Sequence, residues 1–323
     1  MLQRLLFVGL STVITVFFSE KAFAYPQGYT YAELLLYYAF PVYACLWAID
    51  RFRVRRPAAL VLVAALYAFL VEGVLTLVLY EGGLLDPTMP AYFVGWHGLL
   101  SFVFGWYALR KWLVRGQWER VLAMGFVFGL FWGLWSLTYW LPEAYGEWGV
   151  TSRWSIADFG LYTFTFTATL ALSHGLLGRG VWLPEFKPGR IERWVVGLVL
   201  VALFIVNILL ILPLAIFKLA ALLGVIFLAL RAEHVRGEEK SVLSELAGPV
   251  KGLHLPALLS IPIAATGVYA LAVTYRAPEE WIRALLLEST PFFQALIGAG
   301  LFLWALVATL GRRRAHTKRS VIE

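Results

Sequence analysis

Apolar stretches of roughly 17 to 24 residues recur along nearly the whole chain, separated by short loops that carry Lys and Arg. At 1.5 Å per residue, about 20 such residues cross the roughly 30 Å hydrocarbon core of a bilayer as a helix. Of the 323 residues 61% are hydrophobic and the mean hydropathy is +0.76, which is too apolar for a soluble domain. The pattern therefore predicts an all-α, polytopic integral membrane helix bundle.

The basic residues predict an orientation. Most of the 27 Lys and Arg residues fall in six short clusters, such as Arg51 to Arg56 and Arg110 to Arg120. Because cytoplasmic loops are enriched in Lys and Arg, neighbouring clusters should be separated by an even number of spans. We predict about ten transmembrane helices in a single transmembrane domain, residues 1–323, with both termini in the cytoplasm. The predicted spans are 5–24, 31–49, 58–80, 91–109, 121–141, 156–178, 194–211, 213–230, 255–274 and 291–311.

Two regions of this topology, residues 5–24 and 194–230, need separate consideration. Leu5 to Phe18, followed by Ala22-Phe23-Ala24, also has the form of a secretory signal peptide. Its removal would leave nine spans and an outside N-terminus, whereas we interpret residues 5–24 as an uncleaved anchor. Residues 194–230 are too many for one span and have basic residues on both sides, so we predict a hairpin that turns near Pro213.

Several functional classes are excluded by what the sequence lacks. Cys45 is the single cysteine, which rules out an internal disulfide and a thiolate metal cage, and we expect it in the core. No P-loop, G-x-S-x-G, H-E-x-x-H or D-x-x-x-D motif is present. We therefore expect no metal and no cofactor. The net charge of +7 is dispersed beside apolar spans, which favours membrane lipids over nucleic acid as partners.

Glu72 and His97 are the ionisable residues that lie deepest in the predicted spans. Each costs about 2.5–3.5 kcal/mol on insertion scales and needs a compensating partner. They lie at similar depth on antiparallel neighbouring helices, so we predict that they approach within hydrogen-bonding distance. Such a pair can relay protons, act as general acid and base, or supply two metal ligands. A neutral pair that joins two helices is the structural alternative.

Four further polar side chains share the outer level of the predicted bundle: Asp158, Asn207, Lys218 and Gln294. Asn207 and Lys218 flank the predicted turn at Pro213, so we expect them to meet, unless Lys218 extends to the headgroups. If the six helices surround a common centre, these four residues join Glu72 and His97 in one outward-facing polar site.

A polar stripe continues from Asp158 along the sixth predicted span. Tyr162, Thr165, Thr169 and Ser173 follow it at spacings of three or four residues, which places all of them on one helical face. A stripe of this kind can line a path for a solute or a proton. Ser and Thr stripes are also typical of hydrogen-bonded seams between helices.

A ridge of small residues marks the fifth predicted span. Gly125, Gly129 and Gly133 recur at every fourth position. This spacing lets another helix approach the backbone closely, so we predict a helix partner at the ridge.

These features favour one function and leave two alternatives. We expect a secondary transporter or translocator of a small or lipidic solute in the plasma (inner) membrane, because many spans, a Pro-broken hairpin and few buried ionisable groups suit alternating access. The main alternative is an intramembrane enzyme that acts on a lipid or isoprenoid from the outer leaflet, with Glu72 and His97 as acid and base. A non-catalytic subunit of a larger membrane complex is the second alternative.

The predicted orientation can be tested by cysteine labelling from the outside. Because the acidic loops are predicted to face outward, cysteines introduced at Gly83, Gly149 and Pro278 should react with an impermeant maleimide. Cysteines at Arg55, Gly116 and Arg313 should react only after the membrane is opened. The reverse pattern would contradict the orientation.

Overall fold

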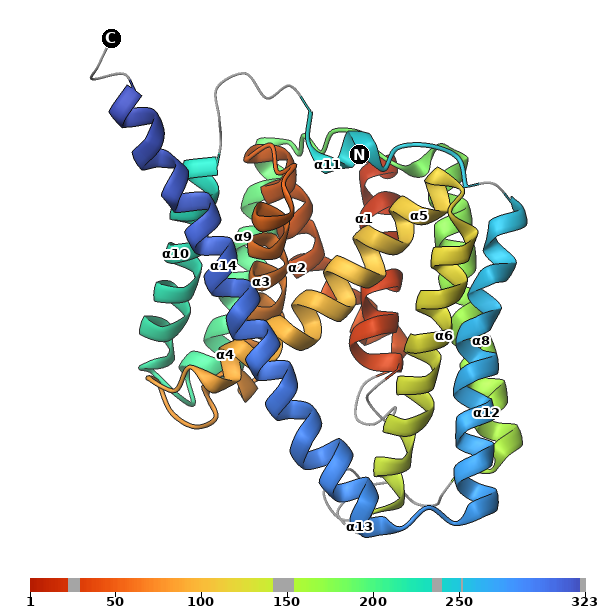
Figure 1. The fold of residues 1–323 in the computed structure, drawn as a ribbon. Helices are drawn as coiled ribbons and strands as arrows, with labels where there is room; N and C mark the ends of the chain where they lie inside the picture. The colour runs from red at the N-terminus through yellow and green to blue at the C-terminus, as the bar shows by residue number, and fades with distance from the viewer. Residues whose placement is uncertain (23–29, 142–153, 234–239, 251, 320–323) are drawn as a thin grey trace.

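The computed structural model describes residues 1–22, 30–141, 154–233, 240–250 and 252–319, and the side chains of the last helix as far as Gly311. Over these residues the chain is all-helical and contains no strand. The helices lie side by side, and Met1 and the end of the last helix lie at the same end of the bundle (Figure 1).

The helices of the first half lie near the predicted spans and often end in a π-helical or 3₁₀ turn, but the span predicted at 58–80 is a continuous helix only as far as Leu75. They are α1 (Leu2–Val16) with η1 (Phe17–Lys21), α2 (Tyr31–Arg51), α3 (Pro57–Leu70) with η2 (Val71–Leu75), the short η3 (Val78–Tyr80), the continuous helix α4 (Thr88–Phe93), η4 (Val94–Ala108) and α5 (Leu109–Arg115), and α6 (Trp118–Trp135) with η5 (Ser136–Trp140).

The helices of the second half also include π-helical and 3₁₀ segments. They are α8 (Ile156–Leu176) with η6 (Leu177–Val181), α9 (Arg190–Phe204) with η7 (Ile205–Leu209), α10 (Ala215–Glu233), the short α11 (Val242–Glu245), η8 (Gly252–Leu259) with α12 (Ser260–Tyr275), and α13 (Glu279–Ile282), η9 (Arg283–Ser289) and α14 (Thr290–Arg319), which run on as one helix.

Eight of these helices are long and apolar enough to cross a membrane, which identifies a multi-pass membrane protein. The other two predicted spans, 91–109 and 156–178, are also continuous helices. They are less apolar, because one carries His97 and several glycines and the other carries Asp158 and several threonines. The count of ten and the cytoplasmic placement of both termini remain predictions.

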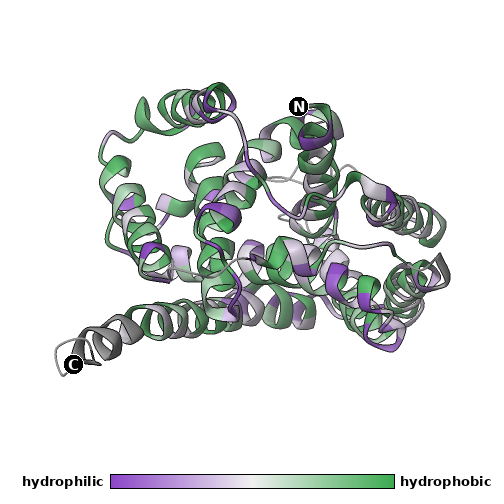
Figure 2. Ribbon diagram, turned by 90° about the horizontal axis from the view of Figure 1, so that it is seen from above, coloured by the Kyte–Doolittle hydropathy of each residue, from purple (hydrophilic) through white to green (hydrophobic). Residues whose placement is uncertain are grey.

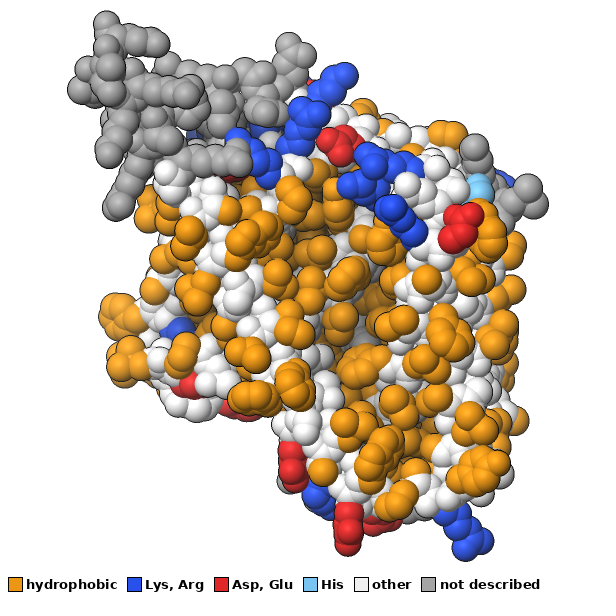
Figure 3. Space-filling view, in the orientation of Figure 1, with side chains coloured by type: hydrophobic (Ala, Val, Ile, Leu, Met, Phe, Trp, Pro, Cys, Tyr) orange, Lys and Arg blue, Asp and Glu red, His pale blue; other side chains and the backbone are white. Residues whose placement is uncertain are grey.

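The surface of the bundle has the polarity of a protein that faces lipid. Hydrophobic residues run along the long helices in Figure 2, and the face in Figure 3 is covered by hydrophobic side chains between two charged ends. Lys and Arg gather mainly at the end where Met1 lies. An apolar belt between polar ends is what the hydrocarbon core requires of its contact surface.

Some helices lie at the centre of the bundle and others lie at its edge. Helix α3 is central, with almost every side chain buried, whereas the hairpin of α9 and α10 is peripheral and exposes most of α9. The chain reverses between α9 and α10 at residues 210–214, which confirms the predicted turn near Pro213. Cys45 is fully buried in α2, as expected.

Glycines let three helices approach η4 closely. A methyl group on Gly95 would overlap the backbone carbonyl of Gln294 in α14, and one on Gly105 would overlap the ring of Phe18 in η1. A methyl group on Gly98 would lie 3.1 Å from the carbonyl oxygen of Ala64 in α3. In Figure 1 the helix α4–η4–α5 and α14 are both tilted and cross one another.

The glycine ridge of α6 packs against α12 of the same chain. A methyl group on Gly129 would overlap the carbonyl oxygen of Ile261, and one on Gly133 would overlap that of Ala265. A methyl group on Gly125 would overlap the Ser260 hydroxyl. Within the described structure, the ridge is thus occupied by a helix of this chain.

We expect Gly129→Ala to lower the melting temperature of the detergent-solubilised protein. The added methyl group forces α6 and α12 apart, and overpacking of this kind costs about 1–3 kcal/mol. The matched control is Gly267→Ala in α12, where an added methyl group meets no atom within 4 Å. Equal melting temperatures for the two variants would contradict the tight α6–α12 contact.

Candidate functional site

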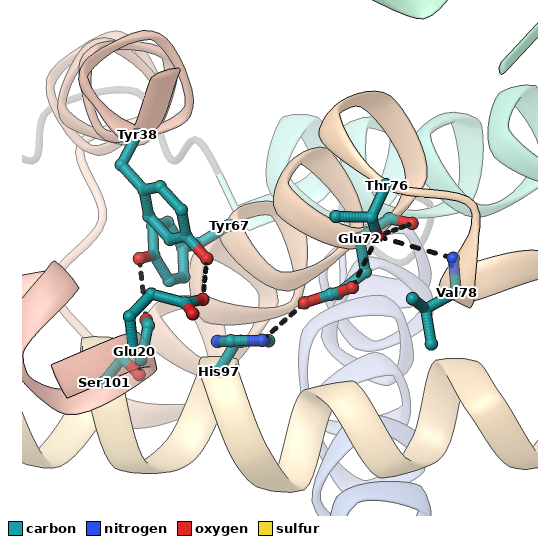
Figure 4. A network of polar contacts seen from close by, with 9 residues as sticks. Glu20, Tyr38, Tyr67, Glu72, Thr76, Val78, His97 and Ser101 are labelled. Carbon is teal, nitrogen blue, oxygen red and sulfur yellow. Dashed lines mark hydrogen bonds and ion pairs between the residues drawn. The ribbon is translucent and has the colours of Figure 1, made fainter. Parts of the chain in front are cut away.

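Glu72 and His97 lie within hydrogen-bonding distance of each other inside the bundle, as the sequence predicts. The Glu72 Oε1 atom lies 2.6 Å from His97 Nε2, and the two residues are only 6% and 4% exposed. The second carboxylate oxygen, Oε2, accepts a 2.7 Å hydrogen bond from the Thr76 hydroxyl (Figure 4). The Phe93 ring stacks on the imidazole at a centroid distance of 5.8 Å. Both oxygens of the carboxylate therefore have partners, and water has little access.

A second carboxylate, which the sequence analysis did not single out, lies beside this pair. Glu20, in η1, accepts a short hydrogen bond from the Tyr38 hydroxyl of α2. In Figure 4 the Glu20 carboxylate lies on the opposite side of the imidazole from Glu72. Glu20 is close enough to both His97 and Glu72 to interact with their charges. His97 Nδ1 is buried and has no hydrogen-bond partner.

Hydroxyl groups extend the cluster on the Glu20 side. The Ser19 hydroxyl donates to the Ser101 hydroxyl at 2.9 Å and lies 3.0 Å from the Tyr67 hydroxyl. Tyr67 also lies edge-on to the His97 ring, with centroids 6.5 Å apart. We define the polar cluster as Glu20, Tyr38, Ser19, Tyr67, Ser101, His97, Glu72 and Thr76. It joins α1–η1, α2, α3–η2 and η4.

The charged and hydroxyl groups of the cluster concentrate in π-helical segments. Glu20 lies in η1, Glu72 in η2, and His97 with Ser101 in η4. π-helical turns are rare and are found frequently at functional sites, because they change the direction of side chains within a helix. No sequence signal marks them, which is one reason why Glu20 was missed. The other reason is its position near the end of an apolar stretch, where Glu20 and Lys21 resemble a membrane boundary.

Gln294 lies where α14 crosses η4. Its backbone carbonyl faces Gly95, two residues before His97, and its side chain is 9% exposed. The side-chain oxygen Oε1 is buried without a hydrogen-bond partner. Gln294 thus lies near the polar cluster, because its backbone contacts η4 two residues before His97. Its side-chain oxygen makes no hydrogen bond to the cluster.

Asn207 and Lys218 do not bind each other, so that expectation was wrong. The Asn207 amide donates to the carbonyls of Val74 and Leu75 at 3.4 Å, and the Lys218 ammonium donates to the carbonyl of Gly83 at 2.9 Å. Free carbonyls occur here because η2 ends at Leu75 and the next residues form a loop. Nor does Lys218 extend freely to the surface, because it is only 8% exposed.

Asp158 does not join an interior site, which corrects its predicted role. It is exposed in the first turn of α8, where its backbone N–H donates to the Ser155 hydroxyl at 3.1 Å and its carboxylate accepts from that hydroxyl at 2.6 Å. This arrangement caps the helix N-terminus. The six candidate residues therefore divide into the Glu72–His97 pair, three separate buried or half-buried groups, and one exposed cap.

The polar stripe of α8 likewise does not form one continuous path. Thr169 and Ser173 donate to backbone carbonyls of their own helix, and Thr165 is exposed. Tyr162 donates at 2.9 Å to the carbonyl of Lys21, beside Glu20. Only Tyr162 connects the stripe to the region of the polar cluster.

Arg110 has a structural role that the sequence did not indicate. In the sequence it belongs to one of the basic clusters that predict the cytoplasmic side. It is fully buried, and its guanidinium donates to the backbone carbonyls of His174, Leu246 and Gly248. Its charge also lies 4.8 Å from the ring centroid of Trp182. Arg110 therefore ties three loop or helix ends together at the basic end of the bundle.

Two cavities lie near the polar cluster, on either side of His97 along the helix α4–η4–α5. The Lys218 cavity, of about 560 Å³, lies between α10, α14 and α4 and borders the loop at residues 84–87. The Arg120 groove, of about 600 Å³, lies between η4 and α6, where Figure 3 shows a hollow in the surface. Both are lined mainly by apolar side chains. Neither Glu72 nor His97 lines either cavity.

We found no group of three metal-ligating side chains among the described residues, and the Glu72–His97 pair supplies only two ligands. Zinc sites require at least three protein ligands. The carboxylates, imidazole and phenols of the polar cluster can take up, transfer and release protons.

We expect removal of one member of the Glu72–His97 pair to destabilise the protein more than removal of both. Glu72→Ala or His97→Ala leaves one polar group buried and unpaired, which costs about 3–5 kcal/mol, whereas a Glu72→Leu/His97→Leu double variant leaves neither. Melting temperatures in detergent measure the difference, with the exposed Glu81→Ala as control. A double variant as unstable as the sum of the single ones would contradict the pairing.

Comparisons of the chain with protein family models, with curated proteins and with solved structures found no match. The geometry of the buried polar residues assigns the polar cluster as the candidate site, with one apolar cavity on either side of His97 along the helix α4–η4–α5.

Proposed function

We propose that this multi-pass membrane protein is a proton-coupled secondary transporter or translocator of a solute with an apolar body. The position of His97 between the two cavities carries the proposal. Val94, three residues before His97, lines the Lys218 cavity, and Leu100, three residues after it, lines the Arg120 groove. One helix thus contributes to both cavities, with the titratable pair midway between its two lining residues.

The composition of the polar cluster supports proton coupling. Two carboxylates lie on either side of one imidazole, so a proton can be held at Glu72, at His97 or at Glu20. Since Glu72 and His97 are almost fully buried, protons reach them only when neighbouring helices move. A transporter that exposes its central site alternately to each side supplies such a movement.

The cavity walls favour a lipidic solute over a small polar one. Phe69, Phe217 and Phe302 line the Lys218 cavity, and Phe104 and Phe131 line the Arg120 groove. Apolar and aromatic walls with few polar groups are typical of sites that bind hydrophobic molecules. A sugar or an amino acid would leave most of its hydrogen-bonding groups without partners there.

An intramembrane enzyme is the second candidate, and the Glu72–His97 contact favours it. A carboxylate that is oriented by Thr76 and paired with an imidazole has the geometry of a general acid and base. However, such an enzyme must bring its substrate to these two residues, and neither lines the cavities described above. A non-catalytic subunit of a larger complex would be expected to bury its glycine ridge against another chain, whereas here the ridge packs against α12 of the same chain.

Proton coupling can be tested in proteoliposomes that contain a pH-sensitive dye. A panel of lipophilic probes, such as decanol, farnesol and a long-chain carboxylate, is added outside, and the internal pH is compared with that of protein-free vesicles. The proposal expects at least one probe to drive a proton flux. Glu72→Gln, which cannot become an anion, should lose this flux and retain exchange of the labelled probe.

The exposed Glu81→Gln is the matched control and should behave as wild type. The proposal fails if no probe raises proton flux above the protein-free level, or if Glu72→Gln and wild type transport protons equally. Mass spectrometry of the same vesicles tests the enzyme. A lipid product that requires Glu72 and forms without a pH gradient would favour catalysis instead.

A further inference from the structure

We propose that the Lys218 cavity binds a long-chain monocarboxylate, with the Lys218 ammonium group as its counter-ion. This inference rests on the proposed function, because it names the class of solute that a transporter would receive at this end. Its evidence consists of the shape of the cavity, the pairing of Lys218 and the charge of the neighbouring Asp86.

The cavity has the size and lining of a site for a single hydrocarbon chain. Its volume of about 560 Å³ lies within the roughly 300–1,000 Å³ typical of ligand pockets. Phe69, Phe217, Phe302 and Leu303 contribute its apolar wall. A hydrocarbon chain that enters the cavity exchanges contact with lipid for contact with apolar side chains, so it meets a similar environment in both places. Selectivity between ligands must therefore come from the polar group of the ligand.

Lys218 supplies a buried cation that is only partly compensated. It is 8% exposed, and its Nζ atom donates one hydrogen bond, to the Gly83 carbonyl at 2.9 Å. An ammonium group has three N–H donors, so two remain for a ligand. In the described part of the chain no carboxylate lies within ion-pair distance of it. A buried charge in this state gains stability when an anion binds.

Asp86 restricts the anion to a single charge. It lines the same cavity and interacts with the charge of Lys218. Hydrogen bonds from the Thr88 hydroxyl and N–H hold the pKa of Asp86 below its ordinary value, so it is ionised at neutral pH. The cavity therefore contains one positive and one negative side chain. A monoanion can pair with Lys218, whereas the second charge of a phosphate dianion has no further cation to pair with among the described lining residues and is repelled by Asp86.

The cavity also leads toward the polar cluster. Phe69 and Val94 line it, and each lies three residues before a member of the Glu72–His97 pair on the same helix. A ligand whose carboxylate binds Lys218 near the loop at residues 84–87 would extend its hydrocarbon chain along this wall. Lys218 thus acts at entry, and the pair acts deeper in the bundle.

Binding of cis-parinaric acid, a fluorescent long-chain carboxylate, and of its methyl ester to the purified protein tests the inference. The acid should bind about tenfold more tightly than the ester, equal to about 1.4 kcal/mol. Lys218→Met should weaken binding of the acid to the level of the ester and leave the ester unchanged. Lys218→Arg should retain most of the preference.

Two further variants keep the test independent of folding. Ala299→Trp, which fills the cavity, should weaken the acid and the ester alike. Lys111→Met, which removes a half-buried lysine bound to the Tyr107 hydroxyl, should change neither. Equal binding of acid and ester by wild type, or full binding of the acid by a folded Lys218→Met protein, would overturn the inference.

The outcome is separable from that of the transport proposal. Equilibrium binding needs no proton transfer, so binding of cis-parinaric acid to wild type can be measured apart from proton flux. Proton flux driven by another probe without binding of the acid would refute the carboxylate site alone. Binding of the acid without proton flux from any probe would leave the site and refute the transporter.

Discussion

Close backbone approach to η4 is the constraint on which the rest of the structure depends. Three other helices contact η4 at Gly95, Gly98 and Gly105. In an apolar medium the hydrophobic effect does not hold helices together, so close van der Waals contact between small residues must do so. Because these contacts leave no room for a side chain, they fix how α1–η1, α3 and α14 lie relative to His97.

The same approach explains why ionisable groups can be buried in the bundle. A carboxylate or an imidazole in hydrocarbon is stable only when a partner meets it with good geometry. The contact of Gly98 with Ala64 brings α3 against η4, and one consequence is the 2.6 Å separation of Glu72 and His97. The contact of Gly105 with Phe18 brings Ser19 and Glu20 to the other side of the imidazole.

Polar side chains outside the cluster mainly satisfy backbone groups, which is a different role. Arg110 binds three carbonyls, Asn207 two and Lys218 one, each at a place where a helix ends or a loop begins. Unpaired carbonyls at helix ends are costly away from water, so a buried side chain that binds them stabilises the fold. Among these residues Lys218 has donors left over and adjoins a cavity, which distinguishes it as a binding group.

The sequence by itself determined the class of the protein and much of its local structure. The lengths and spacing of apolar stretches predicted the helices, and basic flanks together with Pro213 predicted the hairpin of α9 and α10. These features depend on residues that are near in sequence. The depth of Glu72 and His97 on adjacent helices was also sufficient to predict their contact, since a short loop leaves neighbouring helices few arrangements.

Tertiary structure alone decided which of the other polar residues belong together. Depth in the membrane can be read from position along a helix, but the direction in which a side chain faces depends on tilt, on π-helical turns and on the neighbouring helix. For this reason Asp158, Asn207 and Lys218 share a predicted level yet bind separate partners. Glu20 belongs to the site because Gly105 packs against the neighbouring Phe18 and because the Tyr38 hydroxyl donates to its carboxylate. Gly105 and Tyr38 lie on other helices, so no local sequence pattern reveals these contacts.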